Sequence, residues 1–145
     1  MVTYDEVEAI LSQVLDKEWG VFDSPSTRDW EALEYKFNCK FSDDFKIFIT
    51  LMSKYVLPGI LNVSTAENNG NDLIGFVYDY EIKNGNWDAN LIPFLDVGNG
   101  DYFCLSAKES PKSPVYYYYS DNFDVEEYNK NFEEWIKKLP QYHNG

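Results

Sequence analysis

Carboxylates are the side chains of this sequence best placed to do chemistry, and two of them flank a glycine-rich turn. Asp96 and Asp101 lie on either side of Gly98-Asn99-Gly100, so they could meet across a hairpin and share acid–base work. Alternatively, each carboxylate is solvated or caps backbone amides of the turn. A calcium site needs roughly 6–8 oxygen ligands, and the acids here follow no known loop spacing. We therefore predict no metal site.

The sequence offers few histidines, cysteines or glycine-rich loops for other kinds of catalysis. The single histidine, His143, lies close to the C-terminus, and Cys39 and Cys104 are far apart without a motif, which favours two reduced, buried thiols. A histidine-based triad or a histidine–cysteine zinc site is therefore hard to build. The 98–100 turn lacks the lysine and the following helix of a phosphate-binding loop. The sequence predicts a protein that is not an enzyme and has no cofactor, with a carboxylate-dependent enzyme as the less favoured alternative.

The charge balance restricts the class of partner. The chain has 25 acids and 12 bases, a formal net charge of −13. This field repels nucleic-acid phosphates and anionic membranes and attracts basic proteins, although a carboxylate-rich surface also serves solubility alone. No apolar run approaches the roughly 20 residues that span a bilayer, and the acidic N-terminus is unlike a signal peptide. We expect a cytoplasmic protein that binds neither nucleic acid nor membrane.

The first half of the chain is predicted to be helical within a single domain, residues 1–145. Thr3 and Glu6 form a capping box for a helix that ends near Gly20. Residues 24–27 open a second helix, and Ser42 caps a third, which residues 58–59 would stop. The apolar positions expected to be buried are Val7, Ile10, Leu11, Val14 and Leu15 in the first helix, Trp30, Leu33 and Phe37 in the second, and Phe45, Phe48, Ile49 and Met52 in the third.

The second half is predicted to contain most of the strands. Residues 60–63 are a short strand candidate, and residues 91–105 predict a hairpin, with Pro93 at an edge or a bulge. Residues 115–119 predict a further strand. Residues 73–82 fit either a strand or a helix, and a helix would be capped by Asn71 or Asp72 and would bury Leu73, Phe76, Val77 and Tyr80.

A final helix is predicted at the C-terminus. Asp124 and Glu127 have the spacing of a capping box. The stripe that follows is Tyr128, Phe132, Trp135, Ile136 and Leu139, and Pro140 would end the helix. The order of elements predicts an α+β fold with an antiparallel or mixed sheet and helices packed on one side.

Aromatic residues supply a second kind of candidate contact. In a strand, the run Tyr116-Tyr117-Tyr118-Tyr119 directs alternate rings to opposite faces, so one pair faces the core and the other faces out. The outer pair would be a contact platform unless helices or loops cover both faces. Trp87, in a polar loop, has the same two interpretations. The other tryptophans, Trp19, Trp30 and Trp135, lie in or beside helical segments and favour the core.

Three segments resemble the SUKH superfamily, which unites fungal cell-wall-synthesis regulators with bacterial immunity proteins. Residues 30–51 contain a stretch from Phe41 to Ile49 that looks like the family's early acidic, aromatic helix. Residues 91–105 carry a similar glycine-rich turn and aspartate, and residues 115–119 match the strand that follows. The chain departs from the family pattern in three places. Phe41-Ser42 replaces a leucine-proline pair, residues 53–59 stand where a glycine pair is often found, and a histidine common after the late strand is missing.

The resemblance implies an α+β fold with a mixed or antiparallel sheet, and it favours a helix near Leu73. It also implies a role in neutralising toxins of polymorphic toxin systems, many of which are nucleases or deaminases. The family is not known for a shared catalytic set. A regulatory or scaffold role, as in the fungal relatives, is the alternative.

These observations lead to one hypothesis about function: an acidic binding protein, of undetermined oligomeric state, that masks a basic toxin domain. Its carboxylates would mimic phosphates and its aromatic rings would anchor the contact. The residues expected to contact the partner are Asp79, Glu81, Trp87, Asp96, Asp101, Tyr117, Tyr119 and Asp121.

Overall fold

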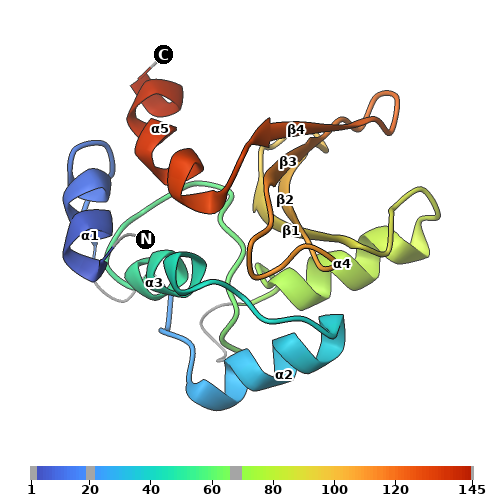
Figure 1. Ribbon diagram of the computed structural model, residues 1–145, viewed down its shortest axis with the longest axis horizontal. Helices are drawn as coiled ribbons and strands as arrows, with labels where there is room; N and C mark the ends of the chain where they lie inside the picture. Colours follow the sequence, from blue (N-terminus) through green and yellow to red (C-terminus); the bar gives the residue numbers. More distant parts are fainter. Residues whose placement is uncertain (1–2, 19–21, 66–69, 145) are drawn as a thin grey trace.

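The computed structural model describes residues 3–18, 22–65 and 70–144, with the side chains of residues 3–18, 22–65 and 70–139. Within these ranges, four helices precede four strands, and a fifth helix follows them (Figure 1). The α+β fold is confirmed. The elements are α1 (Tyr4–Ser12), α2 (Thr27–Phe37), α3 (Asp43–Leu51), α4 (Ile74–Lys83), β1 (Leu91–Asp96), β2 (Tyr102–Ser106), β3 (Val115–Tyr118), β4 (Val125–Asn129) and α5 (Phe132–Asn144).

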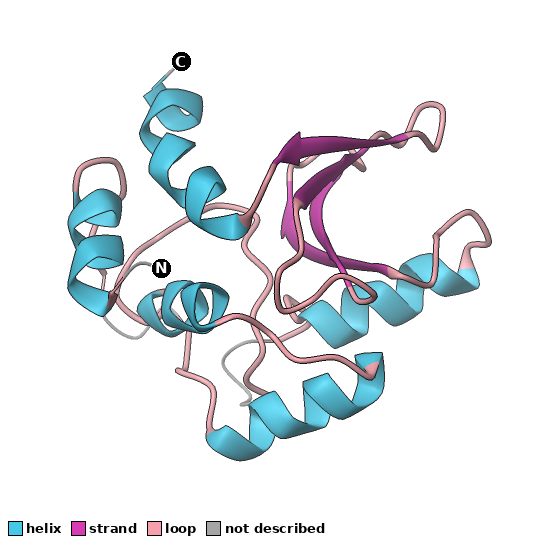
Figure 2. Ribbon diagram, viewed as in Figure 1, coloured by secondary structure: helices cyan, strands magenta, loops and turns pink. Residues whose placement is uncertain are grey.

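The sheet is an antiparallel meander in the order β1-β2-β3-β4. Figure 2 shows that it curves strongly from β1 to β4. The predicted hairpin is formed by β1 and β2, with Ile92 opposite Leu105. Pro93 lies on an edge strand where the register shifts before Leu95, as its missing N–H led us to expect.

Aromatic rings join the helices to one face of this sheet. Phe45 of α3 is fully buried and contacts the rings of Phe94 and Phe132 at centroid distances of 5.7 and 5.1 Å. Phe94 of β1 also meets Trp135 of α5 at 5.1 Å. All three pairs are edge-to-face, the arrangement that ring quadrupoles favour. Helices α3 and α5 therefore cover the same face of the sheet (Figure 1).

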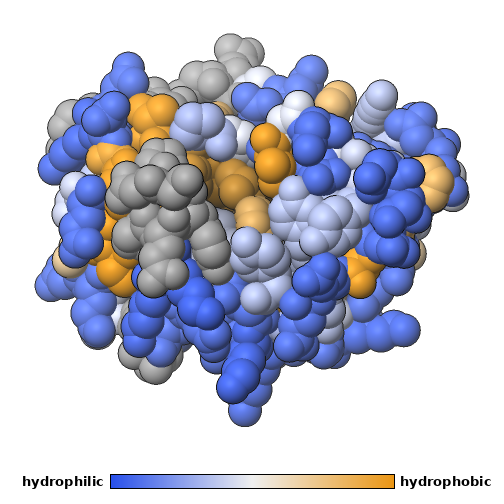
Figure 3. Space-filling view, turned by 90° about the horizontal axis from the view of Figure 1, so that it is seen from above, coloured by the Kyte–Doolittle hydropathy of each residue, from blue (hydrophilic) through white to orange (hydrophobic). Residues whose placement is uncertain are grey.

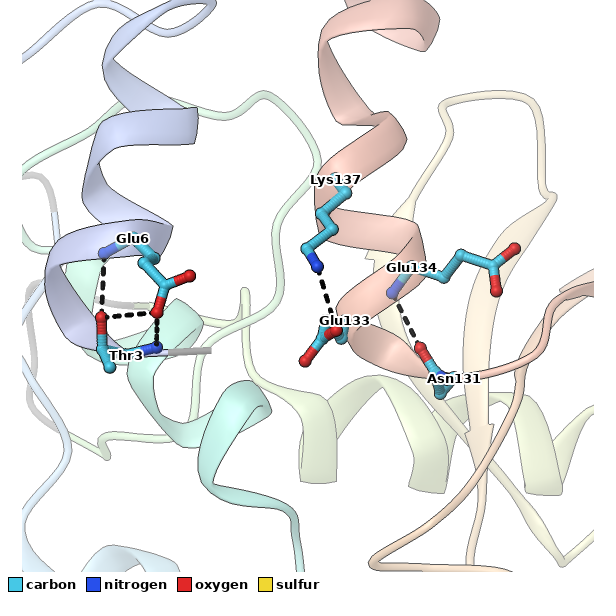
Figure 4. A network of polar contacts seen from close by, with 6 residues as sticks. All are labelled: Thr3, Glu6, Asn131, Glu133, Glu134 and Lys137. Carbon is cyan, nitrogen blue, oxygen red and sulfur yellow. Dashed lines mark hydrogen bonds and ion pairs between the residues drawn. The ribbon is translucent and has the colours of Figure 1, made fainter. Parts of the chain in front are cut away.

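The predicted caps of the first and third helices are confirmed, and the second helix opens within residues 24–27 as predicted. The hydroxyls of Thr3, Ser26 and Ser42 each accept a hydrogen bond from the third amide of their helix, and Thr3 and Glu6 form the expected capping box (Figure 4). Helix α1 is shorter than predicted: it ends at Ser12, and Gly20 lies outside the described residues. After the helix, the backbone forms a hydrogen bond with a later segment: the Val56 amide donates to the Asp16 carbonyl (2.9 Å).

The predicted strand at residues 60–63 is present only as isolated pairings. Ile60 pairs with Leu95, and Asn62 pairs with Leu73. Helix α3 already ends at Leu51, so residues 58–59 do not stop it. Gly59 instead accepts a hydrogen bond from the Asp96 amide (2.7 Å), which attaches this segment to the outer edge of β1.

Residues 73–82 are a helix, but its cap and its buried side differ from the prediction. Leu73 occupies the cap position without a side-chain hydrogen bond, so neither Asn71 nor Asp72 caps α4. Phe76 and Tyr80 are 51% and 53% exposed. The reason is that α4 packs against α2 through Tyr78, whose ring meets Phe37 edge-on at 4.8 Å.

The predicted capping box at Asp124 and Glu127 is wrong. The Tyr119 amide donates to the Asp124 carbonyl (2.9 Å), which starts a hairpin, and residues 125–129 form β4. Helix α5 begins later, where the Asn131 side chain accepts from the Glu134 amide at 2.8 Å (Figure 4). The buried stripe Phe132, Trp135, Ile136 and Leu139 is confirmed, but Tyr128 belongs to the strand and α5 continues through Pro140.

Among the described residues, we find no helix whose length and apolar character would let it span a membrane.

Candidate binding surface

The four consecutive tyrosines divide between the two faces of the sheet. Tyr118 is buried on the face away from α3 and α5, where its ring lies 4.6 Å from Trp87. Trp87 is only 8% exposed, and its indole N–H donates to the Leu91 carbonyl at 2.9 Å. A loop therefore covers this face, and Trp87 and Tyr118 are core residues.

On the other face, four partly exposed rings form what we call the aromatic cluster: Phe103, Tyr117, Tyr119 and Tyr128. Tyr117 lies 5.0 Å from Phe103 and 4.6 Å from Tyr119, and Tyr128 lies 5.0 Å from Phe103. Tyr128 is 40% exposed, and the other three rings are half-buried. Because each ring packs on another, the cluster offers ordered aromatic surface to a partner at little entropic cost.

An apolar groove continues from this cluster towards α5. Phe103 belongs to both, and the groove is lined by Leu57, Pro58, Leu95, Val97, Trp135 and Leu139 with Asp96 among them. In Figure 3, which views the molecule from the side of α5 and β4, hydrophobic residues line a hollow near the middle of the face. The cluster and the groove thus meet at Phe103, and Asp96 adds an acid to the groove.

Asp101 holds the end of β3 in place. Its carboxylate is buried and accepts hydrogen bonds from the Tyr117 hydroxyl (2.7 Å) and the Ser120 amide (2.8 Å). Burial raises the pKa of this carboxyl, but the hydrogen bonds outweigh that effect and hold the pKa below its usual value. Burial and the same carboxylate raise the pKa of Tyr117 well above the ordinary tyrosine value. Asp101 therefore positions Tyr117.

The β3–β4 hairpin displays four exposed acids, Asp121, Asp124, Glu126 and Glu127, which we call the acidic hairpin. The Tyr119 hydroxyl donates to the Glu126 carboxylate at 2.9 Å, and this hydrogen bond raises the pKa of Tyr119. Exposed apolar side chains, Phe123 and Val125, alternate with the acids. The hairpin thus combines negative charge with apolar contact area beside the aromatic cluster.

Half of the predicted contact residues gather here. Asp101, Tyr117, Tyr119 and Asp121 lie together at the end of β3, with Asp121 exposed in the hairpin. Asp96 lines the apolar groove, where its carboxylate accepts from the Gly98 amide at 2.8 Å. Asp96 and Asp101 thus each cap a backbone amide, as the alternative to shared acid–base work predicts.

The other three predicted residues lie on the α4 side of the molecule. Asp79 forms an exposed ion pair with Lys36 at 2.7 Å, and Glu81 accepts from the Tyr102 hydroxyl at 2.8 Å. The ring of Trp87 is buried, so it offers no area to a partner. The structure does not bring these three together with the acidic hairpin.

Sequence reasoning missed Phe103, which it placed in the hairpin without a contact role. It missed Tyr128, Val125 and Glu126 because it assigned residues 124–128 to a helix. The signal that could have found them is the later cap, Asn131, which stands three residues before Glu134 and directly before the buried stripe. Starting the helix there releases residues 125–129 to continue the sheet.

Among the residues the structure describes, no group of three or more histidine, cysteine, aspartate or glutamate side chains is arranged to hold a metal ion. Residues 7–141 match the family SUKH_5, described as SMI1-KNR4 cell-wall. No curated protein matches the chain.

Proposed function

This chain belongs to the SMI1-KNR4 family, and on that basis we propose that it is a non-catalytic immunity protein that neutralises a basic toxin domain by binding it. The observation that carries the proposal is the acidic hairpin beside the aromatic cluster. Exposed carboxylates of the hairpin lie beside rings that are already packed in place, and Glu126 shares the face of Tyr117. A nuclease or deaminase that binds nucleic acid presents the complementary basic surface.

The composition of the surface and the field of the chain suit such a contact. A standard protein interface buries about 800 Å² on each partner. The aromatic cluster and the groove supply its apolar centre, and the acids of the hairpin supply a polar rim. The net charge of −13 would raise the rate of association with a cationic partner by roughly 10- to 1000-fold at low salt.

The test compares two variants with the same total charge. Asp121→Asn, Asp124→Asn, Glu126→Gln and Glu127→Gln change the acidic hairpin. The control, Asp5→Asn, Asp16→Asn, Glu18→Gln and Glu31→Gln, changes exposed acids of the N-terminal region. Both take the net charge from −13 to −9. Capture of the toxin domain encoded beside this chain is measured at low and high salt, together with rescue of cells that express that toxin.

We expect the hairpin variant to lose about 10- to 100-fold in affinity, since four rim charges at up to about 1 kcal/mol each amount to roughly 1–3 kcal/mol. The control should stay within about threefold, because charges far from the interface act only through the screened field. Equal capture by both variants, or capture that salt does not weaken, would contradict the electrostatic mechanism.

The description of the family favours a second candidate, a regulatory scaffold related to cell-wall synthesis. It would use the same surface for a host protein in place of a toxin. Rescue of toxin-expressing cells separates the two functions, because a scaffold gives none.

A further inference from the structure

We propose that the outer edge of β4 binds an extended, lysine- or arginine-rich segment of the protein partner, which adds to the sheet as a fifth strand. This inference rests on the proposed function and specifies how the contact is made. It also predicts which backbone atoms the partner meets.

The two edges of the sheet differ in what covers them. At β1, the Leu61 amide donates to the Phe94 carbonyl (3.0 Å) and the Asp96 amide donates to the Gly59 carbonyl (2.7 Å), so residues 59–61 occupy that edge. At β4, no other strand or isolated bridge pairs with the outer side within residues 3–18, 22–65 and 70–144. An open strand edge presents unpaired N–H and C=O groups, which are a template for another strand.

The register identifies the backbone groups that face outwards. Tyr117 is opposite Glu126, and the Tyr119 amide bonds inwards to the Asp124 carbonyl. Residues of an antiparallel strand alternate between bonding inwards and outwards. The amides and carbonyls of Val125 and Glu127 therefore face the open edge.

Side chains on both faces of this edge select a basic strand. Glu126 lies on the face of Tyr117, and Glu127 lies on the opposite face, paired with Tyr116. Val125 shares the face of Glu127 and is 43% exposed, so an incoming strand also gains apolar contact. A second copy of this chain would set its own acids against these, and like charges opposed across strands destabilise pairing. A partner strand with alternating cations sets them on one face, opposite Glu126, while its apolar residues meet Val125 on the other face, so it has no such penalty.

The probe is a ten-residue peptide of alternating lysine and valine, added to the full chain at low salt. Amide hydrogen exchange is followed by NMR, with an alternating glutamate–valine peptide and a proline-interrupted lysine–valine peptide as controls. We expect the lysine–valine peptide to slow the exchange of the Val125 and Glu127 amides at least tenfold, with smaller effects from both controls.

The outcomes separate the inference from the proposed function. If the lysine–valine peptide binds without protecting these two amides, the strand-edge mode is overturned and the acidic surface remains. If it does not bind at low salt, the strand-edge mode is overturned, and capture of the toxin domain by the hairpin and control variants decides the proposed function. If the proline-interrupted peptide protects the amides equally well, backbone pairing is excluded.

Two variants of one residue test the backbone directly. Val125→Pro removes the outward N–H, whereas Val125→Ala shortens the side chain and keeps the N–H; neither removes a bond to β3. Val125→Pro should bind the lysine–valine peptide about tenfold more weakly than Val125→Ala, and equal binding by two folded variants would overturn the proposal. If circular dichroism shows that Val125→Pro is unfolded, the amide hydrogen-exchange experiment on the natural chain decides whether the edge of β4 pairs with the peptide.

Discussion

Replacing Gly59 with alanine is expected to destabilise the protein by about 3 kcal/mol or more. Gly59 has φ +87°, where a side chain is strained, and a Cβ there would lie 1.9 Å from the carbonyl oxygen of Asp96. The obstacle is backbone, so no rotamer change relieves it. The strain costs about 1–2 kcal/mol and the overpacking about 1–3 kcal/mol more. The free energy of unfolding in urea measures the sum.

Gly85→Ala is the matched control. Its φ is +94°, close to that of Gly59, but a Cβ there meets no atom within 4 Å. We expect a loss of only about 1–2 kcal/mol from the backbone conformation. The difference between the two variants isolates the steric clash with β1. If Gly59→Ala and Gly85→Ala lost equal stability, the backbone of residues 59–61 would have moved to accommodate the Cβ while staying hydrogen-bonded to β1.

The elements that could be predicted are those whose cause is local. The caps of α1 and α3 depend on a hydroxyl and an amide three residues apart, and the β1–β2 hairpin depends on its glycine-asparagine turn. Each signal lies within a few residues and needs no knowledge of distant neighbours. These predictions are confirmed for that reason.

The elements that could not be predicted have distant causes. Asp124 and Glu127 satisfy the local rule for a capping box, but β3 needs a partner along its second edge, and residues 125–129 supply it. Tyr80 fits a helical stripe, but α4 packs on α2 through a different side. A local pattern is overridden wherever a strand or a helix face must be paired with a segment remote in sequence.

The candidate surface likewise has features with local causes, which could be predicted, and features with distant causes, which could not. Alternation along β3 predicted that Tyr117 and Tyr119 share a face, and they do. It could not predict which pair would be covered, because the cover is the loop that carries Trp87. Charge alone identified Asp121 and Asp101 as equivalent contact residues. The structure makes one an exposed hairpin acid and the other a buried support of Tyr117.

That difference between the two acids leads to the second large effect. Asp101→Asn should destabilise the protein by about 2 kcal/mol at pH 7, because hydrogen bonds to a charged acceptor contribute about 1.5–3 kcal/mol. The amide keeps the size of the side chain but sets an NH₂ group against the Tyr117 hydroxyl or the Ser120 amide, both of which donate to Asp101. Asp121→Asn, at an exposed site, should change stability by less than about 0.5 kcal/mol.

The pH dependence of this effect distinguishes the charge of Asp101 from its shape. Its pKa in the folded state lies below the ordinary value of about 3.9 for an unfolded chain. The stabilisation is therefore complete above about pH 4 and is lost as the pH falls through the folded-state pKa. The difference in unfolding free energy between the natural chain and Asp101→Asn, measured in urea, should begin to shrink near pH 4 and disappear below the folded-state pKa. A constant difference down to pH 2 would mean that the geometry of the side chain, and not the carboxylate charge, holds Tyr117 and the end of β3.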